Sequence, residues 1–167
     1  MSAPASNADP AAQDDDPAAA SVSAELASAE AQTSHREQIE TVIAALEQDN
    51  SAMVNHGSEA YLWKFRYGSV EVLVRLTGES DDDTLTVWSP VLSLPARDEA
   101  RLMRQLLELN WSDTFEACFS IFNQQAVVAV NRTNAGLTPG EISRAITLVA
   151  TVADDNDECL QAEFGTA

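Results

Sequence analysis

The chain has 167 residues, the size of a single domain, and 9 lysine and arginine residues against 27 aspartate and glutamate residues give it a formal net charge of −18. Such an acidic surface repels phosphate backbones and anionic lipids, which argues against nucleic-acid and membrane roles. No window approaches the roughly 18 apolar residues that span a bilayer, and the N-terminus lacks a secretory signal, so we expect a cytoplasmic protein.

Residues 1–33 are predicted to form a disordered tail. They consist mainly of Ala, Ser, Pro and acidic residues, and contain six acids but no lysine or arginine. Such a segment buries too little apolar surface to offset the chain entropy of folding. We interpret it as a solubilising brush, with a specific docking arm as the alternative, and expect one domain at residues 34–167.

The first half of this domain is predicted to be one helix followed by three strands. Ser34 and Glu37 have capping-box spacing, and apolar residues at helical spacing follow them, so a helix should begin here and end before His56. Residues 61–67, 70–76 and 84–89 alternate between apolar and polar positions, and short turns separate them. This pattern predicts an antiparallel meander with one apolar face.

The second half is predicted to be a helix, a hairpin and a final helix. Pro95 should open the first of these helices and Asn110 should end it, while residues 114–123 and 126–131 form the hairpin. Thr138 and Glu141 supply the cap of the last helix, with a proline between them. The order α-β-β-β-α-β-β-α predicts an α+β fold in which helices pack on one face of an antiparallel sheet.

Three stretches carry a resemblance to a known family, namely residues 62–76, 106–121 and 137–160. They resemble the YbjN family of small bacterial proteins, particularly its cyanobacterial members. The resemblance implies a fold like that of the type III secretion chaperones, which are small, acidic, dimeric proteins that hold extended segments of client proteins. Members of the family are described as sensory transduction regulators without an established reaction, so the resemblance implies no catalytic residue.

The residues themselves also indicate no reaction. Cys118 would need a base and an electropositive setting to act as a nucleophile, yet His35 and His56 are predicted at a helix start and in a loop. We therefore expect Cys118 to be a packed small hydrophobe. Neither acidic run, Asp81–Asp83 nor residues 154–158, has the glycine and glutamate spacing of an EF-hand, so we predict no metal and no cofactor.

Three groups remain as binding candidates. Asp154, Asp155, Asp157 and Glu158 lie near a helix C-terminus, where acids oppose the helix dipole. They bind a basic partner or adventitiously a divalent cation, or they simply form a solvated helix end. Trp88 and Trp111 lie near element ends and are plausible interface residues. The aromatic stripe of residues 61, 63, 65 and 67 is expected to face a helix as core rather than to form a recognition platform.

The leading functional hypothesis is a non-enzymatic protein-binding module, either chaperone-like or a regulatory adaptor. We expect a homodimer that holds a client protein segment of basic or apolar character, by burial in a groove or by strand addition at a sheet edge. The alternative is a sensory regulator that binds a small molecule between helix and sheet, in a pocket lined by the aromatic stripe. No ligand spacing supports a third hypothesis, a metal-dependent enzyme.

Overall fold

The structure is a computed structural model that describes residues 34–47, 53–56 and 60–166. Contacts group Ser34–Ala167 into one compact unit, and the predicted tail lies outside the described residues. The elements are α2 (His35–Leu46), β1 (Met53–His56), β2 (Tyr61–Tyr67), β3 (Val70–Leu76), β4 (Thr84–Ser93), α3 (Glu99–Ser112), β5 (Cys118–Phe122), β6 (Gln125–Thr133) and α4 (Pro139–Phe164).

The strands form one antiparallel sheet of six strands in the order β1-β2-β3-β4-β6-β5. This confirms the predicted α+β class. The predicted number of strands is wrong, because β1 pairs with β2 at the edge of the sheet and was not recognised in the sequence. A strand of four residues is too short for alternation to be distinguished from chance.

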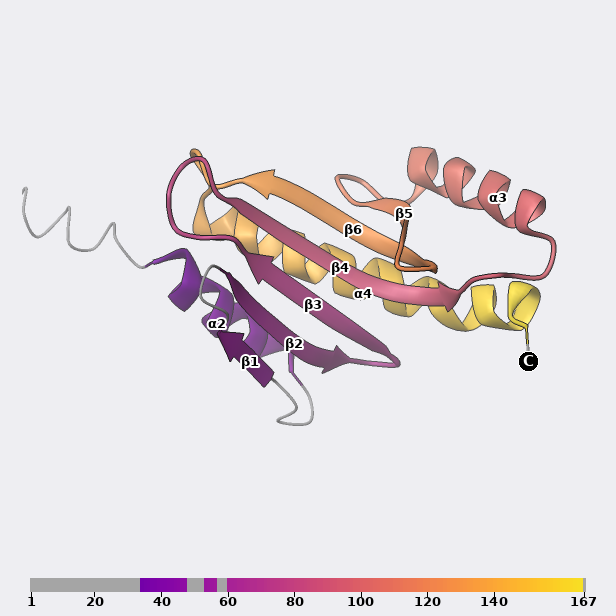
Figure 1. Cartoon of the computed structure of the whole chain (residues 1–167), viewed down its shortest axis with the longest axis horizontal. Coiled ribbons are helices and arrows are strands. Elements are labelled where there is room, and N and C mark those ends of the chain that lie inside the picture. Colours follow the sequence, from indigo (N-terminus) through magenta and orange to yellow (C-terminus); the bar gives the residue numbers. More distant parts are fainter. Residues whose placement is uncertain (1–33, 48–52, 57–59, 167) are drawn as a thin grey trace, which may run out of the picture. The chain divides into compact units, whose positions relative to one another are not determined.

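The helix α4 covers one face of the sheet. Figure 1 shows it crossing behind β3, β4 and β6, and α2 packs against α4. Alternate residues of β3 point into this layer, so Val70, Val72 and Val74 are buried while Glu71 and Arg75 are exposed. We call the face turned away from α4 the outer face.

The aromatic stripe is core, as predicted. Trp63 and Phe65 are each 1 % exposed and belong to the continuous apolar cluster, and Tyr61 and Tyr67 pack against that cluster. The space between helix and sheet at these residues is filled. It therefore offers no room for the small molecule that the sensor hypothesis placed there.

The cap of α4 also follows the prediction. The Thr138 hydroxyl oxygen accepts a hydrogen bond from the Glu141 N–H, and the Glu141 carboxylate accepts one from the Thr138 N–H at 2.9 Å. The hydrogen bonds that the Thr138 N–H and hydroxyl donate to the Glu141 carboxylate lower the pKa of this carboxyl, the backbone bond most strongly. The signal is local to four residues, which is why the sequence alone could locate the helix start.

The predicted boundaries of α3 and the predicted start of β5 are wrong. Helix α3 begins at Glu99 rather than Pro95, because Asp98 caps it by accepting a hydrogen bond from the Arg101 N–H. It also continues past Asn110. Strand β5 begins at Cys118 rather than residue 114, since Phe115 has a φ of +53° and therefore leaves the extended conformation.

Cys118 was predicted to be packed, and this is wrong: it is exposed. Its register with Ala129 places it on the outer face, whereas Phe119 pairs with Val128 on the core face. The strand parity was therefore inferred correctly. The expectation of burial failed because no described element covers the outer face beside β5.

Candidate functional site

The outer face of the sheet is left open by the described elements. Cross-strand pairing arranges its side chains in rows, one of which runs from Leu73 through Trp88 to Ala129 and Cys118. A neighbouring row joins Arg75, Thr86 and Asn131. Apolar and polar side chains thus lie beside each other on the same surface.

A cavity of about 310 Å³ lies on this face, between these rows and β5. We call it the sheet-face pocket. Its floor is apolar, because Val127 and Ala129 are buried. Two aromatic rings lie at its side, where Trp88 and Phe122 make an edge-to-face contact with ring centroids 6.0 Å apart. Arg75, Thr86 and Asn131 line the pocket as well.

The charge at this pocket is opposite to that of the whole chain. None of its lining residues is acidic, and Arg75 is exposed. Within the described residues, the Arg75 side chain makes no ion pair or hydrogen bond. By contrast, six of the other cations are paired with carboxylates, Lys64 with Glu71 at 2.6 Å among them.

A second apolar surface lies on the solvent side of α3. Leu107 is 70 % exposed and Trp111 is 93 % exposed, and they are four residues apart on one side of the helix. Together with Ala100, Arg104 and Glu108 they line a shallow depression. We call these five residues the α3 stripe. Phe115, 80 % exposed, follows directly after the helix.

The two predicted tryptophans thus fall on different surfaces. Trp88 lies at the sheet-face pocket and Trp111 on the α3 stripe. Phe122, Leu107 and Arg75 were not among the predicted binding residues. Their importance comes from the register of β4, β5 and β6 and from the orientation of α3, which no local pattern reveals.

The acidic candidates divide into two pairs. Asp154 accepts hydrogen bonds from the N–H and the hydroxyl of Ser69, at 2.7 and 2.9 Å. Asp157 is buried and also accepts from the Ser69 hydroxyl. These two carboxylates therefore hold the β2–β3 turn against α4. Asp155 and Glu158 are exposed, so only they remain available to a partner or cation.

Among the described residues, we looked for side chains grouped as in a metal site or around a reactive thiol. In the part of the chain that the structure describes, no three His, Cys, Asp or Glu side chains converge as a metal site. The Cys118 sulfur lies 3.5 Å from the Ser120 hydroxyl rather than beside a base. The pKa of the Glu116 carboxyl is lowered, chiefly by its hydrogen bond from Arg144, and this pair lies on the surface away from the sheet-face pocket.

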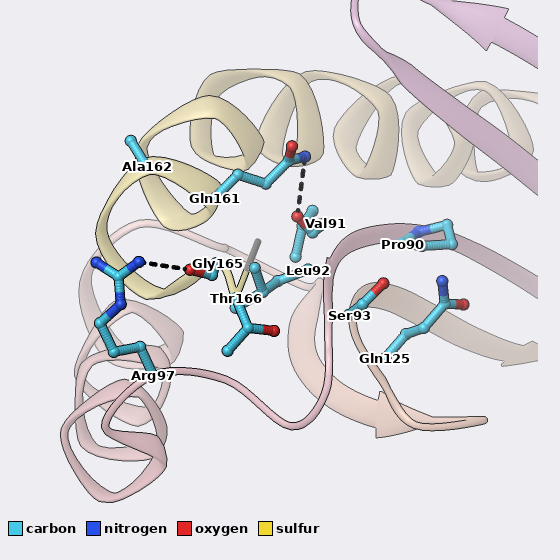
Figure 2. A pocket seen from close by; sticks show the side chains of 10 residues that line it. All are labelled: Pro90, Val91, Leu92, Ser93, Arg97, Gln125, Gln161, Ala162, Gly165 and Thr166. Carbon is cyan, nitrogen blue, oxygen red and sulfur yellow. Dashed lines mark hydrogen bonds between the residues drawn. The ribbon is translucent and has the colours of Figure 1, made fainter.

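A larger cavity, of about 520 Å³, lies where β4 approaches the C-terminal end of α4 (Figure 2). Its polar side chains are largely engaged by the chain itself. Figure 2 shows Gln161 donating to the Val91 carbonyl at 3.3 Å and Arg97 donating to the Gly165 carbonyl at 3.0 Å. These hydrogen bonds hold the C-terminal end of α4 against β4 and the segment that follows β4.

The free edge of β5 is partly blocked. The Asn110 side chain accepts a hydrogen bond from the Phe119 N–H at 2.6 Å and donates one to the Phe119 carbonyl at 3.3 Å. An amide that pairs with both peptide groups of one residue takes the place of a neighbouring strand. Strand addition at this position would first have to displace Asn110 and α3.

These features define a class: a single-sheet α+β protein with one face covered by helices and an apolar pocket on the other. A family model described as "Putative bacterial sensory transduction regulator" matches residues 35–162, and the chain belongs to this family, YbjN. Comparison with curated protein sequences found no match.

Among solved structures, one titled "Crystal Structure of the ExsC-ExsE Complex" is similar, with a TM-score of 0.47 and 13% identity, covering 77% of this chain and 97% of that chain. No helix among the described residues is long and apolar enough to cross a membrane.

Proposed function

We propose that the protein is a cytoplasmic, non-enzymatic protein-binding module, chaperone-like or a regulatory adaptor, that holds a client segment on the outer face of its sheet. The observation that carries this proposal is the sheet-face pocket, with its buried apolar floor and its pair of aromatic side chains. Aromatic side chains at the rim of an apolar pocket are typical anchors of protein interfaces.

The binding mode that the geometry supports is burial of client side chains in the pocket. The alternative, strand addition at β5, is disfavoured because Asn110 already occupies the peptide groups of Phe119. An exposed apolar surface that persists in a highly acidic protein also needs a partner to cover it. Membership of a regulator family is consistent with this role.

We propose further that the protein forms a homodimer through the α3 stripe. If two copies of α3 pack antiparallel about an axis between Leu107 and Glu108, Trp111 of each copy faces Arg104 of the other. Such a contact is self-complementary, as a two-fold interface requires, and it places a cation over an aromatic ring. Leu107, 70 % exposed in the single chain, is buried at its centre.

The experiment is a crossed comparison of two variants. Phe122→Ser removes an aromatic side chain of the sheet-face pocket, whereas Trp111→Ser removes the largest side chain of the α3 stripe. Phe122 is 50 % exposed and Trp111 93 % exposed, so neither change leaves a cavity in the core. Tagged full-length chains are expressed in the native host and recovered, and bound proteins and molar mass are measured.

We expect Phe122→Ser to lose at least about fivefold of the co-purified client, because it truncates an aromatic anchor worth more than 1 kcal/mol, while keeping the dimer mass. Trp111→Ser should show the opposite pattern, a monomer that keeps its client. Equal recovery of client by Phe122→Ser and the wild-type chain, or no stoichiometric client at all, would refute the proposed function.

A further inference from the structure

We infer that the sheet-face pocket receives an apolar side chain that is flanked by carboxylates, so that the client segment is acidic as well as apolar. This inference rests on the proposed function and specifies the chemistry of the partner. The net charge of the chain favours a basic client, as expected from the sequence, whereas the local charge at the pocket favours the opposite sign.

The outer face carries more cations than acids on β2 and β3. On β2 and β3, the described charged side chains of this face are three cations and one acid: Lys64, Arg66, Arg75 and Glu71. The acid, Glu71, is already paired with Lys64. In a chain with 27 acidic residues, this face is therefore a region of net positive charge.

Arg75 lies at the side of the apolar floor, in a row of polar side chains. Arg75, Thr86 and Asn131 follow one another across three strands, and all three line the pocket. A guanidinium, a hydroxyl and an amide thus converge along one side. Guanidinium groups bind carboxylates through two parallel hydrogen bonds, and hydroxyl and amide donors can satisfy the remaining oxygen lone pairs.

The pocket has an apolar part next to this polar row. The next row holds Trp88 and Ala129, and Phe122 contacts the Trp88 ring. Successive side chains on one face of a strand lie about 7 Å apart, and in an extended segment every second residue shares a face, so the segment reaches both parts with residues two positions apart. An apolar side chain can enter beside Trp88 while the carboxylate two residues along the segment reaches Arg75.

Charge also distinguishes this occupant from the alternatives. A basic segment would bring its cations next to Arg75, Lys64 and Arg66, and the pocket lining offers no carboxylate to compensate. The dimer contact proposed for the α3 stripe leaves the outer face open. A second copy of this chain at the pocket is therefore an alternative occupant that the test distinguishes. An acidic and apolar client segment satisfies both parts of the pocket.

The test uses three pentapeptides with blocked ends, Glu-Gly-Phe-Gly-Glu and its Gln and Lys counterparts, titrated into the full-length ¹⁵N-labelled chain. The chain has three tryptophans, so three indole N–H signals report on three places. Trp88 lies at the pocket, Trp111 is on α3, and Trp63 is in the core and serves as an internal control.

We expect the Glu peptide to shift the Trp88 signal in a saturable way and to leave the Trp63 signal unchanged. The Gln peptide should bind about two- to fivefold more weakly, the range of one exposed ion pair, and the Lys peptide more weakly still. Arg75→Gln should reduce the Glu peptide to the affinity of the Gln peptide. Arg144→Gln removes a cation of α4 on the surface away from the pocket, and it should leave the affinity for the Glu peptide unchanged.

Equal or tighter binding of the Lys peptide, a Glu peptide that leaves the Trp88 signal in place, or insensitivity to Arg75→Gln would overturn the inference. A Trp88 signal that shifts on dilution without peptide would assign the pocket to a second copy, and would overturn it too. A different result would refute the proposed function, namely equal recovery of the client by the Phe122→Ser variant and by the wild-type chain. The two failures are therefore distinguishable.

Discussion

At the scale of single residues, the turn between β2 and β3 depends on two carboxylates that come from α4. Ser69 donates hydrogen bonds to Asp154 and Asp157, which are 85 and 88 residues away in the chain. Gly68 has a φ of +52°, and a Cβ atom at this position would collide with the Asp154 carboxylate. The acidic run therefore has a structural role at two of its positions. The expectation that it lies at a helix C-terminus is wrong, because α4 continues to Phe164 and the run lies before the last turn, where the helix dipole acts.

Replacement of Gly68 tests this turn, with Gly136 as the matched control. Gly136 also has a positive φ, +70°, but a Cβ atom there would meet no neighbour within 4 Å. Gly136→Ala should cost only the backbone strain, about 1 kcal/mol of unfolding free energy. Gly68→Ala should cost roughly 1–3 kcal/mol more, because the Asp154 carboxylate is pushed away from its hydrogen-bond donors. The measurement is urea unfolding of both variants, and equal losses would show that Asp154 does not hold the turn.

At the scale of elements, the sequence predicts best where the signal is local. The cap of α4 depends on four consecutive residues, and the meander of β2 and β3 depends on period-two alternation, so both were predicted. Asn110 shows the opposite case. Local rules identified it as a helix end, but its side chain is committed to Phe119 of β5, a tertiary contact that the pattern does not contain.

The candidate site shows the same division. The sequence named Trp88 for a place near the end of a strand, but β4 continues to Ser93 and Trp88 lies in mid-strand. That Arg75 and Phe122 lie at one pocket with it could not be predicted, because they come together only through the order β3-β4-β6-β5, which places strands distant in sequence side by side. The positive charge of the outer face could not be predicted for a related reason, since the net charge of a chain does not indicate which face carries its few cations.

The antiparallel contact of two α3 helices predicts a specific cross-link. In a chain whose exposed Cys118 and Cys159 are replaced by Ser, Leu107→Cys lies next to the proposed two-fold axis and should form a disulfide-linked dimer on mild oxidation. Ser112→Cys is also on α3, but in this arrangement the two copies are offset by about 13 Å along the helix axis. It should therefore stay monomeric on a non-reducing gel. Efficient linking of Ser112→Cys, or none of Leu107→Cys, would exclude this geometry.

At the scale of the whole molecule, the fold separates two tasks. One face of the sheet is buried under α4 and supplies stability, because the apolar core lies in that layer. The outer face supplies the pocket, and α3 supplies a further apolar surface beyond the edge of the sheet. Under the proposed function, we expect the acidic remainder of the surface to repel anionic molecules and the few uncharged or cationic regions to select the partner.

The most direct measurement of the central claim is photo-cross-linking in the native host. A benzoylphenylalanine is placed at position 122, beside the sheet-face pocket, or at position 158, on the exposed side of α4 where the acidic candidates Asp155 and Glu158 lie. We predict a discrete covalent adduct with another polypeptide from position 122 and none from position 158. An adduct from position 158 alone would contradict the account, because it would place the partner on the helical layer instead of the open face of the sheet.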